Sequence, residues 1–357
     1  MSKAYLIAAG FALFMPFLPE AHARAARSQG AKIRVGLVFD LSGRREPAND
    51  VVRGIEFAAA KLRGQGIDIQ LEKFDSKSDG LGTREAMLTM LKSPPDFIIA
   101  EVDSSKAVIA AEIAEKEHRV MITPYATSPM VTAGRNYVFR ACFSDDFQGM
   151  RLAEFAVRDL KRETAALIID GGQLYSKTLA KAFRDRFEAL GGKILAEETI
   201  LDAAGGLEQP LTRLVEKKPK LVFMPVYEPT AAKVLNEISS KDFGDVAFMG
   251  GDGWGASGPF RDLVFAKQRA LNAYWVSHYS GDLNSSILAP IAKDFRSLTS
   301  TNFNASSAIG YDTLMLASGV LKGMGSSSSQ EKLRQAFHRL PPYKGLTGTI
   351  HFATKQD

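Results

Sequence analysis

The sequence predicts an α/β protein built of two doubly wound units, each a parallel sheet covered by helices on both faces. Near-continuous apolar runs alternate with helical patterns along the chain, which is typical of parallel strands buried on both faces. This alternation occurs twice, first from about residue 32 and again from about residue 147. The length of 357 residues also favours two domains, because single cores stop growing near roughly 250–300 residues.

The first unit contains five β-rich apolar runs with helical patterns between them. The runs are short and rich in Val, Ile, Leu and Phe, which favours strands. The predicted strands cover 32–40, 68–75, 96–102, 119–125 and 137–143, and the predicted helices cover 49–64, 83–93 and 106–118.

The second unit repeats this order. Two closing glycines give its first helix a credible C-terminal cap. The predicted strands cover 164–170, 192–200, 220–226, 245–254 and 271–280, and the predicted helices cover 176–192, 208–218 and 229–241. The pattern then changes to helices at 285–300, 305–325 and 330–340, followed by one last strand at 345–352.

The composition argues against several classes of protein. The net charge of +5 is only mildly basic, and its lysines and arginines are scattered among acidic residues, so we expect no nucleic-acid partner. The single cysteine, Cys142, excludes an internal disulfide, and in its apolar context we expect it to be buried and inert.

The first 25 residues have the layout of a secretory signal peptide. Lys3 is followed by an uncharged run from Ala4 to Leu18, and small residues then occur at positions 21, 23 and 25. A transmembrane anchor is the alternative, but the run is shorter than the about 20 apolar residues of a spanning helix. We therefore expect cleavage after Ala23 or Ala25 and export to the periplasm.

Small polar residues follow two neighbouring predicted strands of the first unit. Ser104 and Ser105 follow the third strand, and Ala126 and Thr127 follow the fourth. Ligands of open α/β sheets bind at the carboxyl ends of the strands. A Ser104 N-cap, the free N–H groups of the next helix and these hydroxyls would form a socket for a carboxylate. Plain helix capping at Ser104 and a simple turn at Thr127 are the alternatives.

The second unit places an acidic residue after a strand. Asp252 lies in "MGGDGWG", between two glycines that allow close approach of backbone to a ligand. It would accept hydrogen bonds from an ammonium group. A carboxylate socket and an ammonium acceptor together match an α-amino acid; an aspartate in an exposed glycine-rich turn is the alternative. Trp254 either lines the same cleft or packs inside the second unit.

Enzymatic signatures are weak. The five histidines are scattered without metal-ligand spacing, and no nucleotide-binding glycine loop or nucleophile elbow follows a strand. We expect no catalytic activity, no metal and no cofactor.

Several segments together resemble one family. They are "VGLVFDLSG", "GIEFAAAKL", "VDSSKAVIAAEIAEKEHRVMITPYATSPMVT", "YVFRACFSDDFQG", "LYSKTLAKAFRDRFEALGG" and "GLTGTIHF". Each is modest alone, but in this order they resemble type I periplasmic binding proteins, specifically the leucine/isoleucine/valine-binding group of branched-chain amino acid ABC importers.

The resemblance implies two Rossmann-like lobes joined by three crossovers that close on a ligand. Lobe 1 would hold residues 32–143 and 279–340, and lobe 2 would hold 146–275 and 346–357, after a signal peptide at 1–25. In the family, residues matching Ser104, Ala126 and Thr127 meet the ligand carboxylate, and the one matching Asp252 holds its ammonium. Aromatic side chains that line the closed cleft match Tyr175 and Tyr227.

The chain departs from the family pattern in two places. Arg44 and Arg45 stand in the first loop, where ligand side chains are often met. Either they are solvated, or Arg44 contacts an acidic or polar ligand, which would argue against leucine, isoleucine and valine. The family also continues beyond the segment 345–352, so we expect either the loss of an edge element from lobe 2 or a truncated sequence.

The expected function is that of a periplasmic, non-enzymatic receptor that traps an amino acid or similar small carboxylate and, as a monomer, delivers it to a membrane ABC permease. The alternative is a sensory or protein-interaction scaffold with a degenerate cleft. The sequence leaves open whether Glu101 and Asp103, which flank the socket, point into the cleft; a carboxylate there would repel an anionic ligand.

Overall fold

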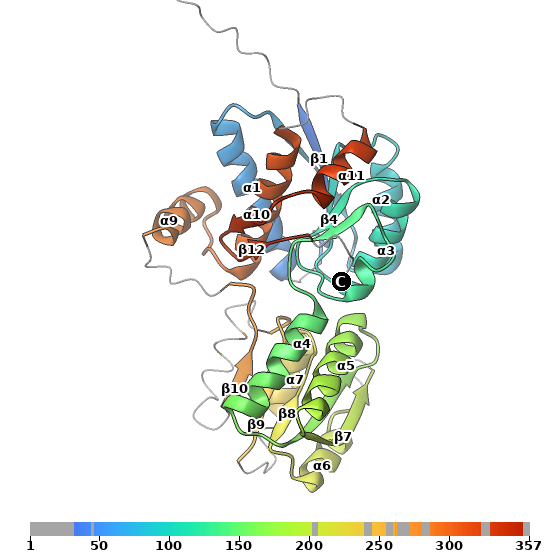
Figure 1. The fold of residues 1–357 in the computed structure, drawn as a ribbon, viewed down its shortest axis with the longest axis vertical. Coiled ribbons are helices and arrows are strands. Elements are labelled where there is room, and N and C mark those ends of the chain that lie inside the picture. Colours follow the sequence, from blue (N-terminus) through green and yellow to red (C-terminus); the bar gives the residue numbers. More distant parts are fainter. Residues whose placement is uncertain are drawn as a thin grey trace, which may run out of the picture. The chain divides into compact units, whose positions relative to one another are not determined.

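Parallel strands form two five-stranded sheets in the computed structural model of the chain (Figure 1). The structure describes residues 32–352, except for 44–45, 202–205, 239–244, 255–259, 261, 263–271, 280–285 and 323–328. The signal peptide predicted at 1–25 lies outside these residues.

The first sheet has the strand order β2-β1-β3-β4-β5, and all its pairs are parallel. Its strands are shorter than the sequence predicts at β4 and β5, because each apolar run continues into the following loop. The bounds are β1 Ile33–Phe39, β2 Ile69–Asp75, β3 Phe97–Ala100, β4 Met121–Thr123 and β5 Val138–Arg140.

Helices cover both faces of the first sheet. Alternate strand residues pack against α1, α10 and α11 on one face, and the residues between them pack against α2 and α3 on the other. This arrangement explains why the central strands β1, β3 and β4 are mostly apolar. The bounds are α1 Glu46–Gly64, α2 Gly80–Met90, α3 Ser104–Lys116, η1 Pro129–Val131, α9 Leu288–Thr299, α10 Ala305–Lys322 and α11 Gln330–His338.

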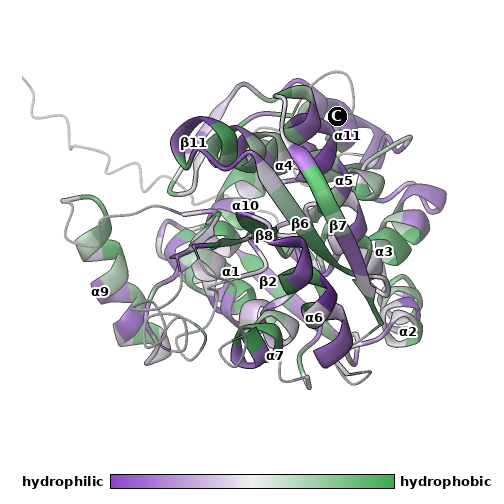
Figure 2. Ribbon diagram, turned by 90° about the horizontal axis from the view of Figure 1, so that it is seen from below, coloured by the Kyte–Doolittle hydropathy of each residue, from purple (hydrophilic) through white to green (hydrophobic). Residues whose placement is uncertain are grey.

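The second sheet has the order β10-β9-β8-β6-β7 and is also parallel. The edge strand β7 mixes hydrophilic and hydrophobic residues along its length, as Figure 2 shows. The bounds are β6 Thr164–Asp170, β7 Lys193–Ile200, β8 Leu221–Phe223, β9 Ala247–Gly250 and β10 Asn272–Trp275.

Helices also cover both faces of the second sheet. One face packs against α4 and α5, which lie side by side (Figure 1), and the other packs against α6 and α7. Trp254 is buried on the second of these faces with Phe260, so it packs inside this part of the protein. The bounds are α4 Asp145–Glu154, η2 Phe155–Asp159, α5 Leu174–Ala189, α6 Glu208–Lys217 and α7 Glu228–Ile238.

The two sheets share one topology. Counted from its first strand, each sheet has the order 2-1-3-4-5, which confirms the duplication predicted from the sequence. In this order the chain reverses its direction of winding between the first and third strands, and ligands of such sheets bind beside the carboxyl ends there. We refer to each sheet with its covering helices as a lobe. The chain passes to the second lobe between β5 and α4 and returns between β10 and α9.

Helices α1 and α10 cross with their backbones in contact on the first lobe. A Cβ atom at Gly54 of α1 would overlap the carbonyl oxygen of Ser307, and one at Gly310 of α10 would overlap that of Val51. Each glycine therefore allows the close approach from its own side.

The last described segment differs from the expected single strand of lobe 2. It forms an antiparallel hairpin of β11 Tyr343–Gly345 and β12 Gly348–Ile350. The buried Asp312 of α10 accepts hydrogen bonds from Leu346 N (2.9 Å) and Thr347 N (2.7 Å) at the turn. Ile350 and Phe352 then pack in the core of the first lobe, because this turn is tied to α10. The sequence predicts the third crossover between residues 340 and 346, whereas Tyr343, Ile350 and Phe352 all pack with the first lobe.

No helix among the described residues is long and apolar enough to cross a membrane.

Candidate functional site

The expectation that Ser104 caps the helix α3 is wrong. Asp103, and not Ser104, is the N-cap of this helix: its carboxylate accepts hydrogen bonds from Ser105 N (2.9 Å) and Lys106 N (3.2 Å). Aspartate caps a helix as well as serine does, and its charge favours the positive end of the helix dipole. Two N–H groups expected to face a ligand are therefore bound by the chain itself, and Asp103 points at the helix.

The backbone N–H of Ala126, in the loop after β4, differs from a second expectation. The N–H of Ala126, expected to face a ligand, donates instead to Thr123 Oγ1 (3.3 Å). Thr127 is buried, and its carbonyl oxygen accepts a hydrogen bond from Asp145 N (2.8 Å). Ser104 is buried beside this loop, where its Oγ accepts a hydrogen bond from Ser128 N (3.2 Å). The hydroxyls of Ser104 and Thr127 thus lie on two adjoining loops at one edge of the first sheet.

Two hydrogen bonds join this edge to the second lobe. Ser104 N donates to the phenol oxygen of Tyr227 at 3.4 Å. Ser105 Oγ accepts from the backbone N–H of Leu174, the first residue of α5, at 3.1 Å. The predicted residues of both lobes therefore meet where the carboxyl ends of the two sheets face each other.

Aromatic contacts continue the connection to Asp252. Tyr227 stacks on Tyr175 with ring centroids 4.8 Å apart and planes inclined by 16°. The phenol oxygen of Tyr175 accepts a hydrogen bond from Gly253 N at 3.0 Å, directly after Asp252. A continuous series of contacts thus runs from Ser104 through the two tyrosines to Asp252.

Asp252 is buried in a polar network that the sequence did not reveal. Its Oδ1 accepts a hydrogen bond from Gln148 Nε2 (2.8 Å), and its Oδ2 lies 2.9 Å from His278 Nε2. Gln148 Nε2 also donates to Asp145 Oδ1 (2.8 Å). One amide group therefore bridges two buried carboxyl groups.

Burial and the charge of Asp252 raise the pKa of Asp145 to about 7. Hydrogen bonds from Thr178, Thr127 and Gln148 oppose this shift but do not cancel it. Asp145 therefore holds its proton more tightly than a free aspartate does, which reduces the repulsion between the two acids.

His278 is enclosed by aromatic rings. Phe143 stacks on its imidazole with centroids 4.2 Å apart, and Tyr125 meets it edge-on at 4.4 Å. His278 lies three residues after the end of β10 and Phe143 two residues before the start of α4, so both passages between the lobes contribute to this cluster.

The sequence analysis did not identify three residues of the network around Asp252, which are Asp145, Gln148 and His278. Asp145 and Gln148 are spaced by three at the start of a helix and so share one face, a signal that could have singled them out. His278 is a lone histidine after a strand, and nothing in the sequence indicates its partner. Arg44, the remaining predicted site residue, lies outside the described residues.

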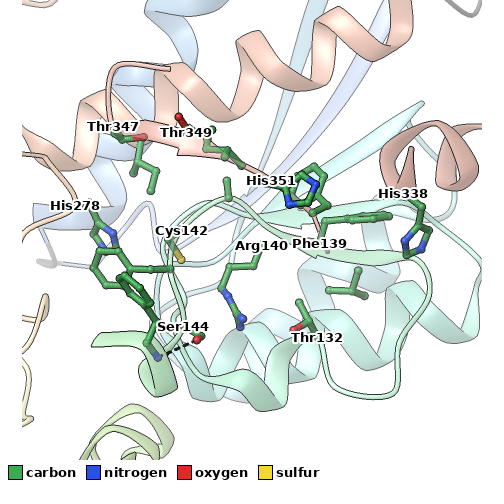
Figure 3. A pocket seen from close by; sticks show the side chains of 17 residues that line it. Thr132, Phe139, Arg140, Cys142, Ser144, His278, His338, Thr347, Thr349 and His351 are labelled. Atoms are coloured by element: carbon green, nitrogen blue, oxygen red, sulfur yellow. Dashed lines mark hydrogen bonds between the residues drawn. The ribbon is translucent and has the colours of Figure 1, made fainter. Parts of the chain in front are cut away.

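A separate cavity of about 490 Å³ lies around β5 and the β11–β12 hairpin (Figure 3). Arg140, His278, His338 and His351 are among its lining residues, as is Cys142. None of the seven described site residues lines it. Burial raises the pKa of the half-buried Cys142 thiol, which makes it unreactive. Within the described residues no group of His, Cys, Asp or Glu side chains is arranged to hold a metal ion.

Comparison with known families assigns the fold. The model of the family described as "Periplasmic binding protein" matches residues 32–357. The chain belongs to this family.

Two curated relatives are the Leu/Ile/Val-binding protein BraC3 of Rhizobium johnstonii and the Leu/Ile/Val-binding protein of Escherichia coli K12. Each is 25% identical to this chain, over 67% and 62% of it respectively. The alignments span 64% and 61% of those proteins, which is less than two thirds of their own length.

Solved structures of similar fold include the leucine-binding protein LivK of Thermotoga maritima, with a TM-score of 0.80 and 23% identity. The match covers 90% of this chain and 91% of that one. LivJ of Streptococcus pneumoniae, in complex with isoleucine, also gives a TM-score of 0.80 at 23% identity, covering 90% and 92%. The two-lobed type I architecture predicted from the sequence is confirmed.

Proposed function

We propose that this protein is a periplasmic, non-enzymatic receptor that holds an amino acid or similar small carboxylate between its lobes and delivers it to an ABC permease. The observation that carries the proposal is the series of contacts from Ser104 to Asp252 across the two lobes. Such a site is complete only when the lobes meet, so a ligand that contacts both lobes favours the closed state. The curated Leu/Ile/Val-binding relatives support the class of ligand.

The ligand carboxylate would bind at the start of α3. There it would accept hydrogen bonds from the hydroxyl of Ser104 and from that of Thr127, which would turn away from Asp145, and it would take the place of the Tyr227 phenol on Ser104 N. Tyr227 would then turn its own O–H to the carboxylate. Tyr175 and Tyr227 would cover the ligand from the second lobe.

Asp252 would hold the ammonium group of an α-amino acid. Gln148 and His278 already contact its two oxygens, but a carboxylate accepts up to about four hydrogen bonds. These two partners therefore orient the carboxylate without exhausting its capacity to accept.

We expect a matching ligand at about 100 times its dissociation constant to stabilise the purified protein by roughly 2.7 kcal/mol. A thermal-shift screen against the amino acids and small carboxylic acids would detect this as a higher melting temperature. Ser104→Ala should weaken binding of the hit about tenfold or more, since a hydrogen bond to a charged group is lost.

The variants Asp252→Asn and Asp146→Ala define the ligand further. Asp146 is exposed on the same helix as Asp145, so Asp146→Ala should bind like the wild type. Loss of binding in Asp252→Asn indicates a ligand ammonium, whereas loss only in Ser104→Ala indicates a carboxylate without one. If no compound shifts the melting temperature, or if the Ser104→Ala variant binds like the wild type, the proposed site is wrong.

A further inference from the structure

The cavity of about 490 Å³ beside β5 is lined by several separate parts of the chain (Figure 3). Strand β5, the loop before α4 and the β11–β12 hairpin with the residues after it supply most of the lining, and α10 and α11 contribute one residue each. Small-molecule sites in proteins have volumes of about 300–1,000 Å³. The cavity therefore has room for a small organic ligand.

The polar part of the lining consists of a cation, imidazoles and hydroxyl groups. Arg140 of β5 carries a permanent positive charge, and His278, His338 and His351 supply three imidazoles. No aspartate or glutamate is among the described residues that line the cavity. Because like charges repel, this lining favours an anion over a cation.

Two buried acids contact lining residues without lining the cavity themselves. Asp252 Oδ2 lies 2.9 Å from His278 Nε2. Asp312 Oδ2 accepts hydrogen bonds from the backbone N and the Oγ1 of Thr347, both at 2.7 Å. Both carboxyl groups are thus bonded to the protein, and Arg140 is the permanently charged group in the lining that a ligand would meet.

Two of the lining histidines keep a ring nitrogen for a ligand. His338 Nε2 lies 3.1 Å from the carbonyl oxygen of Asn136, which only accepts, so this nitrogen carries the hydrogen. His278 uses Nε2 toward Asp252. The Nδ1 atom of each ring has no hydrogen-bond partner among the described residues. A protonated imidazole donates from both nitrogens, so each ring can add a donor for an anion.

The rest of the lining is largely apolar. It includes four phenylalanines and four aliphatic side chains: Phe139, Phe143, Phe147, Phe352, Val138, Ala141, Ile309 and Ile350. An inorganic anion would leave this apolar surface uncovered, whereas an aromatic or aliphatic group would bury it. The two parts of the lining together match a carboxylate on an apolar body.

We propose that this cavity is a second binding site, for a small organic carboxylate with an aromatic or aliphatic body. Arg140 would hold the carboxylate with its planar fork of N–H groups, whose Nη1 donates to Ser128 O at 3.0 Å and so fixes the guanidinium. Thr349 and His351, from the hairpin segment, would bond the carboxylate from a different side (Figure 3). This site is distinct from the candidate site described above and does not depend on the proposed function.

Isothermal titration of the full chain with 3-phenylpropionate and 3-phenylpropionamide tests this inference. The two compounds are similar in size, but only the acid is charged. We expect the acid to bind about tenfold tighter or more, because hydrogen bonds to a charged group are stronger than those between neutral groups. Arg140→Met should lower the affinity for the acid about tenfold or more and remove the preference over the amide.

Thr349→Val and His351→Gln test the same site without a change at Arg140, whose hydrogen bond to Ser128 also supports the loop beside Ser104. Both side chains are exposed, so these variants should stay folded, as checked by circular dichroism. Each should weaken binding of the acid about threefold, since one hydrogen bond to the carboxylate is lost.

Arg339→Met is the matched control. Arg339 is exposed at the end of α11, directly after His338, but it does not line the cavity. The variant loses the same charge as Arg140→Met and should bind the acid like the wild type.

Ser104→Ala separates the cavity from the candidate site, and the acid should bind this variant with wild-type affinity. Loss of binding in Ser104→Ala, with unchanged binding in Thr349→Val and His351→Gln, would place the acid at the candidate site. That result overturns the cavity site and leaves the receptor function intact. Equal affinity for acid and amide, equal losses in Arg140→Met and Arg339→Met, or no binding of the acid would also overturn the cavity site. The receptor function is tested separately, by the thermal-shift screen.

Discussion

Replacing Gly310 with alanine is expected to lower the free energy of unfolding by about 2–3 kcal/mol. The new methyl group would overlap the carbonyl oxygen of Val51 on α1. Backbone atoms of a packed helix cannot rotate away as a flexible side chain does, so α1 and α10 would have to separate. Urea denaturation followed by circular dichroism measures the change.

Gly319 provides the matched control on the same helix. It is exposed, and a Cβ atom there meets no atom within 4 Å. Gly319→Ala should therefore stabilise the protein by about 0.5–1 kcal/mol, as expected for alanine replacing glycine inside a helix. Equal effects of the two substitutions would contradict the close crossing of α1 and α10.

The stability of the protein is expected to fall as the pH rises from about 4.5 to 7, because of Glu101. Burial raises its pKa from 4.5 to about 7, and the charge of Lys106 opposes this only in part. The folded state then binds the proton more tightly than the unfolded state. The stabilisation is complete below pH 4.5 and is lost as the pH rises through 7. A shift of this size corresponds to a loss on the order of 3 kcal/mol.

Glu101→Gln isolates this contribution, because glutamine keeps the shape without the titration. As the pH rises from 5 to 8, the free energy of unfolding of the variant should increase relative to that of the wild type. Urea denaturation at each pH measures this difference. A difference between the two proteins that stays constant over this range would show that Glu101 ionises normally.

The alternation of apolar runs and helical patterns was sufficient to predict both sheets. The central strands of these sheets are buried between two layers of helices, so their apolar pattern follows directly from their position. The run 345–352 was predicted as one strand of the second lobe, but this region forms two short strands that pair only with each other among the described residues. Its packing depends on Asp312, which lies more than thirty residues earlier.

The candidate site was predicted less completely than the fold. Strand ends and neighbouring hydroxyls indicated Ser104 and Thr127. Asp103 was not identified as the cap, because serine and aspartate compete equally for that position. The partners of Asp252 come from two distant segments, at Gln148 and His278, and only the tertiary structure brings them together.

Both tryptophans of the chain, Trp254 and Trp275, belong to the core of the second lobe. Selective excitation of tryptophan therefore reports on one half of the molecule, while the first lobe contributes no emission. Fluorescence and circular dichroism recorded during the same denaturation would consequently diverge if the lobes unfold in separate steps, and would coincide if they unfold as one. Tryptophan fluorescence therefore reports the unfolding of the second lobe without an added label.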